Sequence, residues 1–153
     1  MNKKILAILG VTVVLIVFFV GSCTGCLYYR QSQYSKTAVP YIKEVFPKIA
    51  QWNPSEISSY MAPAALKNTS EEELGRLLMW FSTLGEFQSM EEPSSGGFNI
   101  GASDQLGRYT ILTYSFKATF EAGEADVAIR LLVVPDGFKI FGFNLSSKAL
   151  IPG

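Results

Sequence analysis

The sequence predicts an α+β domain in which helices pack on a curved antiparallel sheet, behind an N-terminal transmembrane helix. Residues 5–29 contain no charged side chain. Helix start signals and helical apolar spacing fill residues 37–85, and three segments with apolar side chains at every second position fill residues 107–147. Because a sheet that is apolar on one face must be covered, the helices that precede it are expected to pack against it.

The uncharged N-terminal segment is long enough to cross a membrane. A helix of about 20 apolar residues spans the bilayer core, and basic residues next to a span favour the cytoplasmic side. Lys3 and Lys4 precede the segment, so we expect a cytoplasmic N-terminus and a periplasmic or extracellular remainder. The expected organisation is a transmembrane anchor, a polar linker and one extracytoplasmic domain, over residues 1–29, 30–36 and 37–153.

A bacterial lipoprotein signal is the alternative interpretation of the same segment. Signal peptides combine a basic start, an apolar middle and small residues at the cleavage site. Residues 20–23, Val-Gly-Ser-Cys, would then place a lipidated Cys23 at the mature N-terminus. Both interpretations attach the same domain to a cell membrane.

Composition excludes several classes of function. The chain has no histidine, and its two cysteines, Cys23 and Cys26, lie in the apolar segment. Metal sites and nucleophile–imidazole pairs depend largely on His and Cys, so we expect no metal and no cofactor. The 13 acidic side chains all follow the anchor, where they outnumber the basic ones, and no basic cluster is present. We therefore expect no nucleic-acid partner.

Two helices are predicted directly after the linker. The first carries an apolar stripe at helical spacing. Its members are Val39, Ile42, Phe46 and Ile49. The second begins at residues 53–56, Asn-Pro-Ser-Glu, because a capping Asn, a Pro at the first helical position and a Glu three residues after the cap are typical of helix starts. Residues 62–68 are expected to form a connection.

A third helix is predicted from Ser70 to Gly85. The glutamates of residues 71–73 complement the positive end of the helix dipole. Successive helical positions diverge by about 100°, so these glutamates do not converge on a metal ion. The buried stripe of this helix is expected to contain Leu74, Leu77, Leu78 and Phe81.

The remaining chain predicts strands. Two short strands are expected over residues 87–91 and 98–102, with a loop over residues 93–97, whose Pro-Ser-Ser-Gly-Gly composition is typical of turns. Residues 110–121 then alternate apolar and polar side chains, which predicts a strand with one buried face. After Gly123 the alternation resumes, and a Pro-Asp-Gly turn at residues 135–137 leads into a third strand that closes an antiparallel meander.

The order of elements, helices followed by an antiparallel meander, resembles that of a known superfamily. The resemblance covers about residues 37–148 and rests on residues 114–124, on Pro-Asp-Gly-Phe-Lys-Ile at residues 135–140 and on Gly-Phe-Asn at residues 142–144. These stretches resemble the nuclear transport factor 2-like, or cystatin-like, superfamily, particularly its small membrane-anchored bacterial envelope proteins. The resemblance implies a cone formed by the sheet and the helices. This fold hosts both enzymes and binding modules, so the function depends on the residues of the site.

The inner face of that cone is the candidate site. We expect it to be lined by Leu112, Tyr114, Phe116, Ile129 and Leu131. A ligand pocket is one interpretation, in which the Tyr114 hydroxyl binds the ligand, and a packed core is the other. Superfamily enzymes place an acid–base residue inside the cone, whereas Glu124 and Asp126 are expected on the opposite face.

The leading functional hypothesis is therefore a non-catalytic, membrane-anchored binding or interaction module. Its expected partner is another envelope protein or a small apolar ligand. A small isomerase or hydrolase-like enzyme that uses the cone, and an immunity or inhibitor protein, are the alternatives.

Overall fold

The structure of the chain, a computed structural model, describes residues 3–151. Within its first helix, the side chains of residues 4–7, 19, 21–24, 27–28 and 31 are outside the description. The Cys23 side chain, the predicted lipidation site, is among those outside the description.

The chain divides between Lys36 and Thr37 into two compact units. Helix α1, Lys3–Ile49, supplies the whole described part of the first unit and the start of the second. Residues 30–36, expected as a polar linker, are helical, because they contain no Gly or Pro that would stop the helix.

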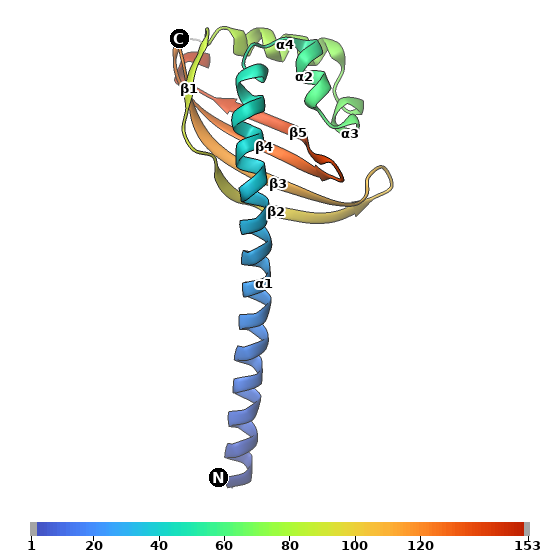
Figure 1. Cartoon of the computed structure of the whole chain (residues 1–153), viewed down its shortest axis with the longest axis vertical. Helices are drawn as coiled ribbons and strands as arrows, with labels where there is room; N and C mark the ends of the chain where they lie inside the picture. The colour runs from blue at the N-terminus through green and yellow to red at the C-terminus, as the bar shows by residue number, and fades with distance from the viewer. Residues whose placement is uncertain (1–2, 152–153) are drawn as a thin grey trace. The chain divides into compact units, whose positions relative to one another are not determined.

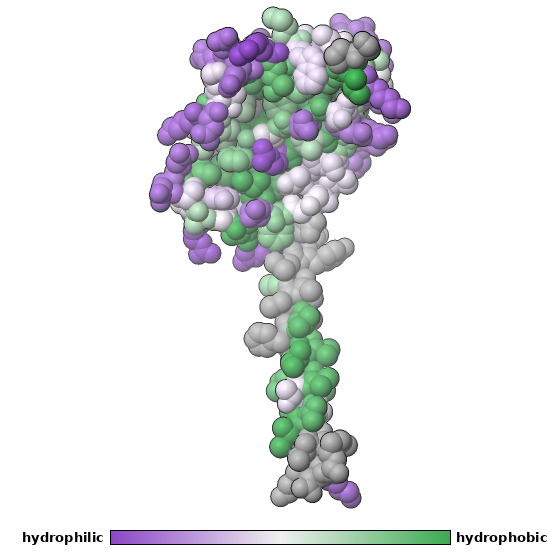
Figure 2. Space-filling view, turned by 180° about the vertical axis from the view of Figure 1, so that it is seen from behind, coloured by the Kyte–Doolittle hydropathy of each residue, from purple (hydrophilic) through white to green (hydrophobic). Residues whose placement is uncertain are grey.

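Between Ile8 and Val20, the described side chains of α1 are mostly apolar and exposed. Among the side chains that are described, no helix is long and apolar enough to cross a membrane. Figure 2 shows large apolar side chains in green along this part of α1. The exposed ones are Ile8, Leu9, Val11, Val13, Val14, Leu15, Ile16, Val17, Phe18 and Val20.

The second unit is an α+β domain with a curved antiparallel sheet (Figure 1). After α1 come α2 (Pro54–Tyr60), α3 (Pro63–Lys67), α4 (Glu71–Ser82), β1 (Phe87–Met90), β2 (Ser94–Ser103), β3 (Gly107–Phe120), β4 (Gly123–Val134), β5 (Gly137–Ser146) and the short 3₁₀ helix η1 (Lys148–Leu150). The strand order is β1-β3-β4-β5, and β2 also pairs with β3. The predicted α+β class of this domain, with helices and a curved antiparallel sheet, is confirmed.

The predicted helix starts are confirmed by their hydrogen bonds. The Asn53 side chain accepts a hydrogen bond from the backbone N–H of Ser55 at 3.1 Å. Ser70 and Glu73 form a reciprocal capping box at the start of α4, with bonds of 3.1 and 3.3 Å. Each cap satisfies backbone N–H groups that the helix itself leaves without a partner.

Two segments differ from the prediction. Residues 63–67, expected within a connection, form α3, because Pro63 suits the first position of a helix and the preceding Ala62 N–H donates to the Ile140 carbonyl at 2.8 Å. Residues 94–97, expected as a loop, belong to β2. Pairing with β3 outweighs their loop composition, and Gly97 takes a φ of +115° at a bulge in the pairing.

The alternation in β3 and β4 places one face of the sheet in the core. Tyr114 pairs with Ile129 and Phe116 with Val127 across the two strands. The buried residues of these strands are Leu112, Tyr114, Phe116, Ala118, Phe120, Ala125, Val127, Ile129, Leu131 and Leu132. Apart from Leu132, they follow the alternation that the sequence predicts.

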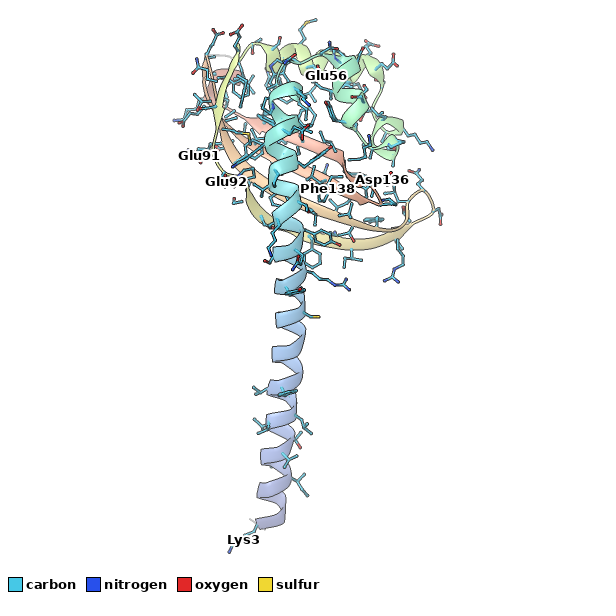
Figure 3. The ribbon with its side chains drawn as sticks, viewed as in Figure 1. Lys3, Glu56, Glu91, Glu92, Asp136 and Phe138 are labelled. Carbon is cyan, nitrogen blue, oxygen red and sulfur yellow. The ribbon has the colours of Figure 1, made fainter. Side chains whose placement is uncertain are left out.

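Aromatic rings join the end of α1 to the sheet. The Phe46 ring lies 4.9 Å from that of Phe116 and 5.7 Å from that of Phe87, edge to face in both cases. Lys43 of α1 also forms an ion pair with Glu92, which Figure 3 labels. These contacts fix the last turns of α1 on the domain.

Trp52 follows the end of α1 and occupies the left-handed backbone region, with a φ of +57°. Its indole ring is 9% exposed and lies 5.5 Å from the Phe81 ring and 5.9 Å from the Phe120 ring. Its buried Nε1–H has no hydrogen-bond acceptor among the described residues. The backbone conformation costs L-residues about 1–2 kcal/mol, and the aromatic burial offsets that cost.

Tyr41 gives the domain a pH-dependent stability at alkaline pH. Its ring lies 5.5 Å from that of Phe138, labelled in Figure 3. Burial, followed by the nearby Tyr60 and Glu44, raises the pKa of the Tyr41 phenol above its ordinary value of 10.0. As the pH rises past 10, the unfolded phenol loses its proton while the folded one keeps it. The contribution of Tyr41 to the free energy of unfolding is therefore fully present below pH 10 and decreases above it.

Tyr41→Phe is expected to remove this part of the alkaline decline. The measurement is the free energy of unfolding of both proteins from pH 8 to 11. The pKa of Lys48 is also raised, by its hydrogen bond with Tyr60, and this contribution is common to both proteins. Parallel stability curves above pH 10 would contradict the role of Tyr41.

Candidate functional site

A pocket of about 270 Å³ lies between β5 and the segment that contains α3 and α4. We call it the α3–β5 pocket. Its lining residues are Met61, Ala65, Asn68, Thr69, Leu74, Leu77, Arg130, Phe141, Gly142 and Phe143. The lining is mostly apolar and contains one charged group, a combination that is typical of small-molecule and peptide sites.

The wall formed by β5 depends on a bulge. Arg130 of β4 pairs with Gly142, whereas the next residue, Leu131, pairs with Ile140. Phe141 is therefore an extra residue in β5. Such bulges redirect side chains and often lie next to functional sites.

Arg130 lies across Gly142. A Cβ atom at residue 142 would lie 2.7 Å from the Arg130 Nη2, so a larger residue would displace the guanidinium. The Arg130 Cζ lies 5.6 Å from the centroid of the Phe141 ring, a distance at which a cation and an aromatic ring attract each other. Among the ion pairs of the described residues, none involves Arg130.

The opposite wall comes from α4. Leu74, Leu78 and Phe81 are buried, as predicted, whereas Leu77 is 38% exposed and lines the pocket. The prediction of a buried Leu77 is therefore wrong. Its helical position is rotated by about 60° from that of Leu74, away from the core. This rotation makes Leu77 an accessible apolar wall.

The predicted site residues lie elsewhere, in the core. Tyr114 is 1% exposed and has an interaction partner. Leu112, Phe116, Ile129 and Leu131 are also buried. The structure brings all five together on one face of β3 and β4. A packed core accounts for this burial, and a ligand-binding role for Tyr114 stays a prediction.

Glu124 and Asp126 are both exposed. They line a second, open hollow of about 600 Å³ near η1. Glu124 lies 3.8 Å from Lys117 there. Both carboxylates are on the face of the sheet that points away from the core, as the alternation predicts.

No group of three or more His, Cys, Asp or Glu side chains is placed to hold a metal ion within the described residues. Sequence analysis missed the α3–β5 pocket, and the available signal was the Phe-Gly-Phe run at residues 141–143, which interrupts the alternation of β5. Comparison of the sequence with protein-family models and with curated proteins found no match.

Proposed function

We propose that this chain is a membrane-anchored, non-catalytic binding module whose α+β domain lies on the periplasmic or extracellular side. The domain recognises an apolar group, on a small ligand or on another envelope protein, in the α3–β5 pocket. The observation that carries this proposal is an accessible apolar pocket with a single cationic group. The curved sheet and its helices are compatible with the nuclear transport factor 2-like superfamily, to which we assign the domain.

The anchor rests on the N-terminal part of α1. Residues 5–29 lack charge, and the described large side chains between Ile8 and Val20 are apolar and exposed. Ten large apolar side chains on a water-exposed surface would be costly, and a bilayer removes that cost. Lys3 and Lys4 favour the cytoplasmic side for the N-terminus.

Binding at the pocket can be measured through the methionines. The chain contains four, and Met61 lines the pocket, whereas Met79 on α4 is 73% exposed and does not. N-acetyl-leucinamide serves as a neutral apolar probe. We expect it to shift the ¹³C-methyl resonance of Met61 saturably in the full chain in nanodiscs, and to leave those of Met79 and Met90 unchanged.

Leu77→Asp is expected to abolish that shift, because a carboxylate would replace part of the apolar wall. Met79→Asp is the matched control, since it adds the same charge to α4 outside the pocket. Circular dichroism checks that both variants remain folded. A Met61 resonance that does not respond to the probe in the unmodified chain would refute the proposed site.

A further inference from the structure

We propose that the natural ligand of the α3–β5 pocket is the apolar C-terminal end of a protein chain, with its terminal carboxylate bound to Arg130. This inference rests on the proposed function and specifies the ligand of the same pocket. It follows from three features of the pocket: its charge, its size and its position on the sheet.

The positive charge of Arg130 favours an anionic ligand. Arg130 lines a mostly apolar pocket, and no ion pair that the described residues form involves its guanidinium. Guanidinium groups bind carboxylates through two parallel hydrogen bonds. Contact with Phe141 and the close fit over Gly142 restrict where this guanidinium can lie, so it is partly preorganised. The favoured ligand therefore joins a carboxylate directly to an apolar group.

The volume of the pocket favours the end of a molecule as the bound part. At about 270 Å³, the pocket is slightly smaller than the range of about 300–1,000 Å³ that is usual for drug-sized ligands. It suits one or two apolar side chains better than a complete large ligand. An apolar C-terminal residue offers such a side chain together with its carboxylate.

The position favours a peptide. On the side of β5 away from β4, the pairing found in residues 3–151 is the single bridge between Met61 and Ile140. The pocket begins directly beyond that bridge, at residues 141–143 of the same strand. An extended peptide can add to a strand edge of this kind through its backbone. A fatty acid has the carboxylate and the apolar chain but cannot form those hydrogen bonds.

The test compares three probes in the full chain in nanodiscs, with the Met61 methyl resonance as the readout. N-acetyl-leucine carries the carboxylate and a peptide group, N-acetyl-leucinamide lacks the charge, and hexanoate lacks the peptide group. We expect N-acetyl-leucine to bind about tenfold more tightly than its amide, because hydrogen bonds to charged groups are the stronger ones. Hexanoate is expected to bind more weakly than N-acetyl-leucine.

Variants locate the effect. Arg130→Gln should make the acid and the amide bind equally, and Gly142→Ala should weaken the acid selectively by displacing the guanidinium. Residue 142 does not have a positive φ, so its backbone accepts alanine. Arg108→Gln, which removes an exposed arginine from β3 outside the pocket, is the control and should leave all three affinities unchanged.

Each other outcome has a distinct meaning. Equal affinity of the acid and the amide in the unmodified chain would overturn the role of Arg130 and leave the proposed function standing. Hexanoate binding as tightly as N-acetyl-leucine would overturn the assignment to a protein C-terminus in favour of a fatty acid. If no probe shifts Met61, both the inference and the proposed site fail.

Discussion

Replacing Trp52 by alanine is expected to lower the free energy of unfolding by about 3–5 kcal/mol, the usual cost of removing a large buried aromatic side chain. The indole ring packs against both Phe81 and Phe120, so its loss would leave a cavity beside aromatic rings from α4 and β3. The left-handed backbone is retained in the variant, and alanine pays the same conformational cost as tryptophan.

The variant Trp52→Phe distinguishes the contribution of aromatic packing to stability from that of the Nε1–H group. Phenylalanine keeps most of the packing and removes the Nε1–H, which has no acceptor among the described residues. Loss of an unsatisfied donor removes a desolvation penalty, so this variant should be much closer to the unmodified protein than Trp52→Ala.

Urea unfolding of the full chain in detergent, followed by near-ultraviolet circular dichroism, measures both effects. Trp80→Ala is the control, because Trp80 is 47% exposed and substitutions at exposed positions usually change stability little. If Trp52→Ala were as stable as Trp80→Ala, the central packing role of Trp52 would be wrong.

Under the membrane anchoring that we propose, replacing both Val13 and Ile16 by arginine is expected to move the protein from the membrane fraction to the soluble fraction. Both side chains are exposed on α1. An arginine near the centre of a membrane helix costs about 2.5–3.5 kcal/mol, so the pair opposes insertion by about twice that amount. Sucrose-gradient flotation of membranes measures the distribution.

Substitution of the same two residues by leucine is the matched control and should leave the protein in the membrane. Intact mass of the unmodified, membrane-extracted chain then separates the two anchors. A chain that begins at Met1 supports the spanning helix, whereas an acylated chain that begins at Cys23 supports the lipoprotein. Soluble protein in the leucine control would contradict the anchor itself.

Local physics explains which parts of the fold could be predicted. The caps at Asn53 and Ser70 depend on atoms within three residues, and the buried face of β3 depends on simple alternation. The strand conformation of residues 94–97 depends on pairing with β3, which follows them in the chain. Their own composition does not indicate that pairing. The short helix α3 likewise depends on a hydrogen bond to β5.

The candidate site depends on the register between strands β4 and β5. Arg130 meets Gly142 because β4 and β5 pair with a shift of one residue at Phe141. The Phe-Gly-Phe run interrupts the alternation of β5 but does not show which residue of β4 lies opposite Gly142, so alternation alone cannot bring Arg130 to the site. The residues predicted to line a pocket, by contrast, follow the alternation of β3 and β4, and alternation identifies the buried positions of the core.

The order of synthesis adds a temporal consequence to the packing of α1. Phe46 contacts rings on β1 and β3, and Tyr41 contacts Phe138 on β5. These two helix residues therefore leave the ribosome before the strands that they contact. At about 5–20 residues per second, the intervening chain of about 100 residues takes about 5–20 s to synthesise. A nascent chain that pauses before β3 therefore presents the apolar side of this helix uncovered, the form that chaperones and proteases engage.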